Sequence, residues 1–222
     1  MLFKVSYSLQ KDIENYLNSV WKFSYRKFGR EKPEDKFLTS YPVVFRKQIR
    51  KARSRKEAEK VIYDFLNSLP KNFQDLIPVI AKGVEVILNE NQKEIVNILE
   101  KVYGQKFPFK HIKVYLTTAP IFPYNYKELW FMTGRNSSLP KHISTAKHEL
   151  NHFMFYYYYA DELTKQGVSL TKQEKFKEAL AILTNPEGND KPEVKELEKF
   201  ILKHKDKPLE KIIALSLKSG VL

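Results

Sequence analysis

The sequence predicts an α+β fold that is mainly helical, with a small antiparallel or mixed sheet ahead of one long, buried helix. Apolar residues recur at three- and four-residue spacing through most of the 222-residue chain, which is typical of amphipathic helices. Two neighbouring segments, residues 111–118 and 129–133, instead have the alternation or the β-branched and aromatic content of strands. The helix that follows them is apolar nearly all round beyond His152, so we expect it to be buried.

The first of two predicted parts, residues 1–105, is helical apart from a short strand at its start. A polar stretch with two prolines divides its helices. Gly104 ends the last of them, because glycine readily adopts the left-handed conformation that follows a helix. In chain order we expect a strand at 1–7, a helix at 10–28, a loop at 29–42, one long helix at 43–69 and one or two helices at 75–103.

The second predicted part, residues 106–222, contains the two strands and the buried helix, and we expect it to form one globular unit with the first part. A loop with two prolines, at 119–127, joins the strands. Ser144 or Thr145 is a candidate cap for the buried helix, since a hydroxyl can accept hydrogen bonds from the first turn, and Gly167 is its candidate end. Further helices are expected at 169–185, with Ser169 or Thr171 as cap, and at 192–203 and 209–217.

The buried helix carries the pentad His148-Glu149-Leu150-Asn151-His152, which has the pattern H-E-x-x-H. Residues four apart lie on one face of a helix, so the two imidazoles can bind one metal ion. Glu149 lies about 100° further round, where its carboxylate can reach a water on the metal without becoming a ligand. The alternative is a surface helix with two unrelated histidines. We favour the metal site, because polar side chains in a buried helix need partners and a metal supplies them.

The order of two strands, a helix with the pentad and a later helix with glutamates resembles the zincin metallopeptidases, and among them the gluzincins. The resemblance covers residues 111–185, and its specific motif is the pentad. It implies a zinc ion, a small sheet whose edge strand binds extended peptide, and a glutamate ligand from a second helix. The metzincin branch does not fit, because Phe155 and Tyr158 stand where its pattern has glycine and histidine.

Glu178 and Glu174, both on the helix predicted at 169–185, compete for the place of third ligand. Glu178 precedes the apolar run 179–183, where a carboxylate is costly unless a cation lies beside it, so we favour Glu178. Glu174 is then expected outside the ligand sphere, accepting a hydrogen bond from a ligand histidine. The reverse assignment also fits, since the gluzincin spacing E-x-x-x-D loosely matches Glu174 as the ligand.

The resemblance implies a peptidase in which His148, His152 and Glu178 hold one zinc ion and Glu149 is the general base. Zinc lowers the pKa of a bound water to about 7, and Glu149 would pass the proton of that water to the leaving amine. A further donor is needed to stabilise the oxyanion. The candidates for this donor are Tyr156, Tyr159 and His204.

The net charge of +13 keeps a second class of function open. Residues 46–60 hold eight lysines and arginines against two glutamates, and such a stretch can bind the phosphates of a nucleic acid. A solvated helix face is the simpler explanation of this segment. The alternative function is a basic, nucleic-acid-associated or regulatory binding protein with a vestigial or structural metal site. Glu149 favours the peptidase, because a structural zinc site needs no base.

Composition predicts a soluble, cytoplasmic protein. The chain has no cysteine, so it has neither disulfides nor thiolate metal ligands. No apolar stretch reaches membrane-spanning length, and the first residues do not have the pattern of a signal peptide. The expected partner is a peptide or protein substrate, with nucleic acid as the alternative.

Overall fold

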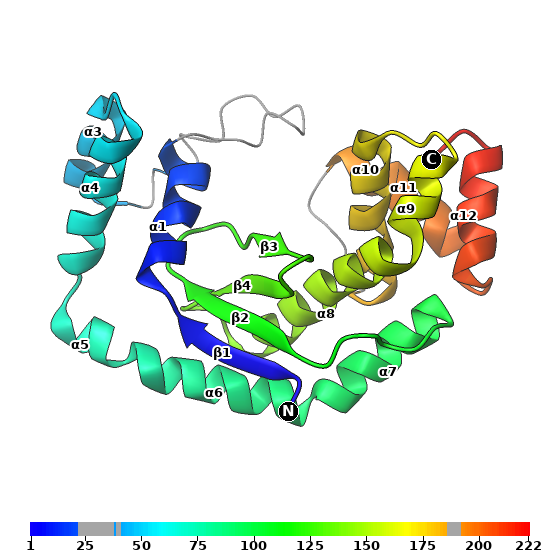
Figure 1. Cartoon of the computed structure of the whole chain (residues 1–222), viewed down its shortest axis with the longest axis horizontal. Coiled ribbons are helices and arrows are strands. Elements are labelled where there is room, and N and C mark those ends of the chain that lie inside the picture. The colour runs from blue at the N-terminus through cyan, green and yellow to red at the C-terminus, as the bar shows by residue number, and fades with distance from the viewer. Residues whose placement is uncertain (22–37, 39–40, 186–191) are drawn as a thin grey trace.

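The computed structural model describes residues 1–21, 38, 41–185 and 192–222, and a four-stranded sheet lies at its centre (Figure 1). The strand order is β1 (Phe3–Tyr7), β2 (Ile112–Thr117), β4 (Trp130–Gly134) and β3 (Tyr124–Asn125). The first three strands are parallel, and β3 runs antiparallel to β4 at the edge. The sheet is therefore mixed, and the predicted α+β class is confirmed.

Alternation along the strands divides the sheet into an apolar face and a polar face. Phe3 and Val5 of β1 are buried together with Ile112 and Val114 of β2, whereas the intervening Lys4 and Lys113 are exposed. On the polar face, Lys11 lies over the ring of Trp130 at 4.1 Å, a cation–π contact that shields part of β4.

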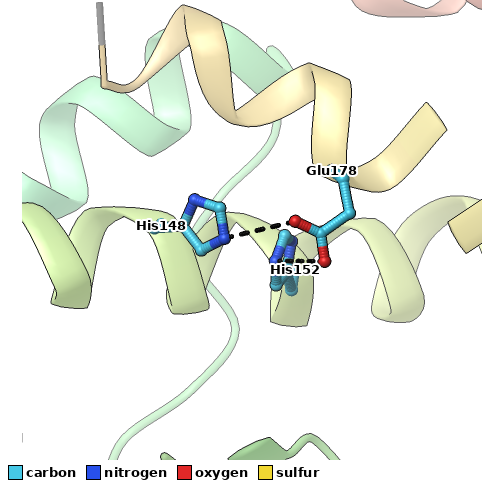
Figure 2. A group of neighbouring side chains, drawn as sticks. All are labelled: His148, His152 and Glu178. Carbon is cyan, nitrogen blue, oxygen red and sulfur yellow. Dashed lines mark ion pairs between the residues drawn. The ribbon is translucent and has the colours of Figure 1, made fainter. Parts of the chain in front are cut away.

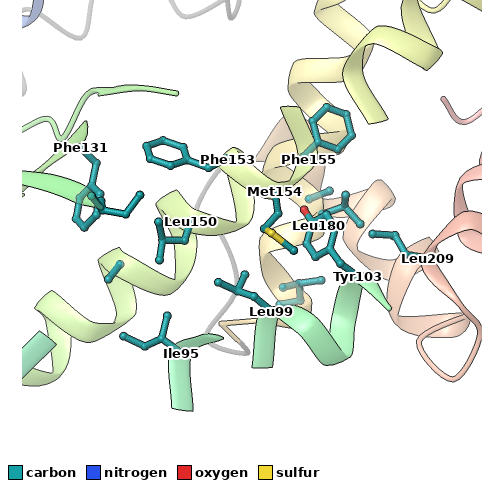
Figure 3. Close-up of a cluster of buried hydrophobic side chains, with 14 of the residues drawn as sticks. Ile95, Leu99, Tyr103, Phe131, Leu150, Phe153, Met154, Phe155, Leu180 and Leu209 are labelled. Atoms are coloured by element: carbon teal, nitrogen blue, oxygen red, sulfur yellow. The ribbon is translucent and has the colours of Figure 1, made fainter. Parts of the chain in front are cut away.

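Helices α6 (Ile77–Glu90) and α8 (Leu139–Phe155) pack on the sheet, and α7 (Gln92–Tyr103) packs on these two helices. Helix α6 lies along β1, and α8 packs on both α6 and α7. Gly104 has φ +62° and ends α7 in the left-handed conformation, as its sequence position predicts. Their side chains form a continuous core with the strands, part of which Figure 3 shows. Each fully buried Leu or Phe in it contributes roughly 1.5–3 kcal/mol relative to an exposed one.

A smaller apolar cluster lies around the N-terminal helices. It joins α1 (Leu9–Tyr16), the π-helical turn η1 (Leu17–Trp21), α3 (Val43–Lys51) and α4 (Arg55–Asn67). Tyr16 is buried against the rings of Phe45 and Phe65, each at 6.2 Å between centroids. The short helix α5 (Lys71–Asp75) leads from this cluster to α6.

The chain beyond α8 is also helical, and α10 packs on α8. The π-helical turn η3 (Tyr156–Ala160) and α9 (Asp161–Lys165) extend α8, and Gly167 follows with φ +81°. Ser169, one of the two predicted cap residues, caps α10 (Leu170–Leu180). Its hydroxyl accepts a hydrogen bond from the Lys172 amide. The remaining elements are the 3-10 turns η4 (Ala181–Leu183) and η5 (Pro192–Val194) and the helices α11 (Lys195–Lys203) and α12 (Leu209–Lys218).

The helix predicted at 43–69 is wrong as a single element, because the chain breaks between α3 and α4. Ala52 is extended, with ψ 118°, and the Ser54 hydroxyl accepts from the Glu57 amide as the cap of a new helix. A serine cap therefore overrides an apolar spacing that continues through the break.

The start predicted for the motif helix is also wrong. The helix begins at Leu139, with Ser138 as its N-cap residue, so Ser144 and Thr145 lie inside it. Pro140 belongs to the first turn, where the amide that proline lacks has no helical partner in any case. The loop predicted at 119–127 contains the short strand β3. The end of the helix predicted at 10–28, residues 22–28, lies outside the described residues, as does most of the loop predicted at 29–42.

The sheet joins the two predicted parts of the chain, since β1 belongs to residues 1–105 and β2 to residues 106–222. Across the described residues, no helix is both long and apolar enough to cross a membrane.

Candidate metal centre

Helix α8 presents His148 and His152 on one face, one turn apart. Their ring centroids are 4.4 Å apart, with the planes inclined at 73°. The side chain of His152 is 1% exposed and that of His148 is 24% exposed. The pair therefore has one histidine deep in the protein and one at the solvent side.

Glu178 of α10 reaches across to both histidines (Figure 2). Its Oε2 lies 3.5 Å from His148 Nε2, and its Oε1 lies 3.5 Å from His152 Nε2. One ligand atom from each of the three residues can be chosen so that all lie within 4.8 Å of one another. The structure thus brings together the three residues that the sequence singled out.

These distances fit the donor set of a small divalent cation. Bonds of about 2.0–2.2 Å in a tetrahedron place neighbouring ligand atoms about 3.4 Å apart. The two separations of 3.5 Å are close to that edge length but join the two rings to different oxygens of Glu178, and one ligand atom from each residue can be chosen within 4.8 Å of the others. A tetrahedral ion held by two imidazoles and one carboxylate has a fourth position left open. Because His148 is partly exposed, this position would face solvent.

Glu149 is buried beside this group and does not belong to it. It follows His148 on α8, so its carboxylate leaves the helix in a different direction from the two rings. Burial is the main cause that raises the pKa of Tyr124, and the charge of Glu149 is one of the smaller causes. The Glu149 carboxylate therefore lies within electrostatic reach of the edge strand β3.

A buried lysine, Lys177, occupies the space between Glu178 and β3. Its side chain is 1% exposed, and its Nζ donates to Glu174 Oε2 at 2.7 Å, to the Tyr156 hydroxyl at 3.3 Å and to the Tyr124 hydroxyl. The same Nζ lies 3.8 Å from Glu178 Oε1. The ammonium group thus lies between two carboxylates, that of Glu178, which is 8% exposed, and that of Glu174, which is 31% exposed.

The two tyrosines complete a closed network around Lys177. The Tyr156 hydroxyl donates to Glu174, and the hydroxyls of Tyr124 and Tyr156 are 3.0 Å apart. The ring of Tyr124 also contacts the ring of His152, with centroids 5.2 Å apart. We call Lys177, Glu174, Tyr124 and Tyr156 the lysine cluster. It joins β3, η3 and α10 beside His148, His152 and Glu178, which we call the metal-ligand group because they could hold an ion.

Glu174 and Tyr156 are therefore close to the candidate site, in roles other than those predicted. Glu174 accepts from Tyr156 and Lys177, and not from a histidine as expected. It also lies outside the group that can hold a metal among the described residues.

The other two candidate oxyanion donors lie elsewhere. The Tyr159 hydroxyl donates to Glu210 of α12, and its ring packs on Tyr103. His204 follows the last turn of α11 and packs on Phe200. Two further histidines have structural surroundings: His142 is buried in α8 with its Nδ1 2.9 Å from the Thr133 hydroxyl, and His111 is exposed at the start of β2.

Sequence reasoning missed Lys177 and Tyr124. Lys177 had a signal, since a lysine next to Phe176 on the apolar side of a helix needs an anionic partner. Glu174, three residues earlier, is the partner that helical spacing offers. Tyr124 had no comparable signal, because its place depends on a two-residue strand in a segment with the composition of a loop.

The basic segment 46–60 is divided between α3 and α4. On α3, Lys47, Arg50 and Lys51 are exposed, and the helix has no acidic residue. On α4 the charges are partly paired, because Arg55 contacts Glu14 and Glu59 and Lys60 contacts Asp64 at 3.1 Å. Exposed cations thus lie on both helices, and of the two helices α3 is the one without an acidic residue.

Fold and site together define a mixed α+β protein with two histidines and a glutamate arranged as a potential metal site. Comparison with the models of known protein families found no match, and comparisons with curated proteins and with solved structures found none either.

Proposed function

We propose that the chain is a zinc-dependent peptidase whose metal is held by His148, His152 and Glu178. The convergence of these three side chains from two helices, with Glu149 next to the first histidine, is the observation that carries the proposal. The pentad and the order of strands before it support the gluzincin-like assignment. The antiparallel edge strand β3, one end of which reaches the site through Tyr124, agrees with a sheet edge that binds extended peptide.

The two imidazoles and the carboxylate suit zinc, which when bound supplies a Lewis acid and a water of lowered pKa. Glu149 is the general base, taking a proton from the attacking water and returning it to the leaving amine. Glu149 is 6% exposed and directly follows His148 on α8, next to the proposed metal position.

The donor for the developing oxyanion is assigned to Tyr124. Burial raises the pKa of its hydroxyl, which therefore stays protonated and able to donate. In the structure this hydroxyl lies next to Tyr156 and Lys177, so it exchanges one of these contacts for the substrate oxygen. Lys177 is a positioning residue, since its own donors are directed at Glu174 and the tyrosines.

The proposal is tested with the whole chain and fluorescein-labelled casein as substrate. We expect one zinc ion per chain, cleavage that a chelator abolishes and zinc restores, and loss of at least a hundredfold in rate for Glu149→Gln with zinc still bound. His152→Ala removes the metal, whereas His204→Ala, at a histidine distant from the site, is the matched control. A chain that binds no divalent metal, or a Glu149→Gln variant of full activity, contradicts the proposal.

The exposed cations of α3 favour one second candidate, binding of nucleic acid by residues 46–60. Lys47, Arg50 and Lys51 present positive charge with no acidic residue on the same helix. We expect binding to duplex DNA or RNA that weakens steeply as salt rises and that persists after chelation. Replacement of these three residues by glutamine then weakens binding to all sequences alike, and undetectable binding at low salt excludes this candidate.

A further inference from the structure

The edge of the sheet opposite β3 is formed by β1, and only part of this edge is closed. The parallel register sets Phe3 opposite Ile112, and the Ile112 amide donates to the Leu2 carbonyl at 2.8 Å. In such a ladder the even-numbered residues of β1 bond to β2. The backbone groups of Phe3, Val5 and Tyr7 therefore point away from the sheet.

Helix α6 closes the first half of this edge with side chains four residues apart. Asn89 accepts from the Phe3 amide at 3.0 Å and donates to the Phe3 carbonyl at 2.9 Å. Glu85 accepts from the Val5 amide at 2.9 Å. These side chains replace a neighbouring strand, which is one way in which proteins protect an edge.

The third position of this series is Ala81, which has no polar atom to offer. Residues 81, 85 and 89 share one face of α6, so Ala81 is the side chain that follows Glu85 along β1. Among the described residues, none bonds to the Val5 carbonyl or to the Tyr7 amide. Closure of the edge therefore stops after Val5.

A cavity of about 600 Å³ lies at this point. Residues Lys4 to Tyr7 of β1 line one side, and the remaining lining includes apolar residues from the end of α4, from the segment after it and from α6: Leu66, Leu69, Ile77 and Ala81. None of its lining residues belongs to α8 or α10, so it is separate from the metal-ligand group. In Figure 1, β1 and β3 lie on opposite edges of the sheet.

The charge at the mouth of the cavity favours an acidic occupant. The side chains of Lys4 and Lys82 are 80% and 70% exposed there. They lie 3.5 Å and 3.3 Å from the Glu85 carboxylate, so one anion is shared between two cations and the local charge stays positive. The net charge of the chain, +13, has the same sign.

We propose that the β1 edge is a docking site for an extended, acidic segment of a partner protein. The segment adds to β1 as a fifth strand, bonding to the Val5 carbonyl and the Tyr7 amide, with alternate side chains in the cavity. Its acidic side chains face Lys4 and Lys82. The site does not depend on the metal or on peptidase activity.

The test uses the full chain and a fluorescein-labelled heptapeptide of alternating valine and glutamate, measured by fluorescence anisotropy. We expect saturable binding, at least tenfold weaker for the corresponding valine–lysine peptide, with slowed hydrogen exchange at the Tyr7 amide. Two further peptides carry N-methyl groups on alternate amides, so that each blocks the hydrogen bonds of one edge of the added strand. We expect one of these peptides to bind at least tenfold more weakly and the other to bind as before. Equal binding of both sets, or no binding of the valine–glutamate peptide, overturns the proposal.

Two single substitutions on α6 form a matched pair of variants. Ala81→Gln places an amide where it can close the Tyr7 group and fill the cavity, so we expect at least a tenfold loss of peptide binding. Val86→Gln makes a polar replacement of an apolar residue on the exposed side of the same helix and leaves binding unchanged. Peptide binding that survives Ala81→Gln contradicts the assignment. It is also contradicted if the chain self-associates and Ala81→Gln abolishes that self-association, because the occupant is then a second copy of the chain. Because chelation leaves peptide binding intact, failure here is distinct from failure of the proposed peptidase.

Discussion

Lys177 and Glu178 are neighbours in sequence, and their charged groups also meet in space, with Lys177 Nζ 3.8 Å from Glu178 Oε1. Glu178 therefore has the candidate metal-binding histidines on one side and a buried ammonium group on the other. The carboxylate is balanced by a cation even when no metal is bound. Lys177 also donates to the Tyr156 hydroxyl of η3, which continues α8, so these contacts link α10 to the extension of α8 without a metal ion.

Lys177→Met is expected to destabilise the metal-free protein by about 3 kcal/mol, because it leaves buried carboxylates and tyrosines without their shared cation. Zinc should recover part of that loss, since a metal on Glu178 replaces one of the missing charge contacts. Urea unfolding with and without zinc measures both effects. Lys203→Met, at an exposed lysine of α11, is the control. Equal stability of Lys177→Met and wild type in the absence of metal refutes the role assigned to Lys177.

Glu178→Gln and Glu174→Gln separate the two candidates for third ligand. We expect Glu178→Gln to weaken zinc binding by more than a hundredfold, because it removes an anionic ligand. Glu174→Gln should weaken binding by about tenfold or less, because Glu174 acts through Lys177 and Tyr156. Competition with a chromophoric zinc chelator gives both affinities. The opposite order would make Glu174 the ligand.

Tyr124→Phe tests the donor assigned to the oxyanion. Loss of one such donor lowers kcat by roughly 10²–10³, and the zinc content should not change. Tyr115→Phe is a suitable control, since Tyr115 lies on the polar face of β2 and packs on Trp130. Steady-state kinetics on a cleaved peptide separate kcat from KM. A fall in affinity alone would make Tyr124 part of the substrate-binding edge only.

The Glu85 carboxylate links stability to pH. The Val5 amide, and then Lys82 and Lys4, lower the pKa of Glu85 from its ordinary value of about 4.5. A lowered pKa stabilises the fold at pH values above the ordinary pKa of about 4.5. This contribution is lost as the pH falls below about 4.5 and through the folded-state pKa. Glu85→Gln should remove that part of the acid sensitivity while still accepting from Val5. Chemical unfolding between about pH 6 and pH 3 measures it, with Glu90→Gln on the same helix as control. An unchanged slope in Glu85→Gln would contradict the link.

Local patterns predicted the elements around the site well. The strands at 112–117 and 130–134, the motif helix and the helix with Glu178 all follow from spacing and composition. The approach of Glu178 to the two histidines depends on tertiary packing. It could still be predicted, because a carboxylate in an apolar run needs a cation beside it.

Features that depend on competing local interactions were not predictable in the same way. Apolar spacing runs through the break at Ala52, where the Ser54 cap decides the structure. The motif helix begins at Leu139, ahead of two other plausible hydroxyl caps. Strand β3 exists only because β4 provides a partner, so the two-residue segment with Tyr124 has no signal of its own.

The pairing of Phe3 with Ile112 also bears on how the protein is made. More than a hundred residues, including helices α1 and α3 to α7, leave the ribosome before β1 has its strand partner. Contacts between such distant positions close slowly. The nascent helices must therefore avoid aggregation while their apolar faces wait for the sheet, and the high positive charge of the chain supplies the mutual repulsion that keeps neighbouring copies apart.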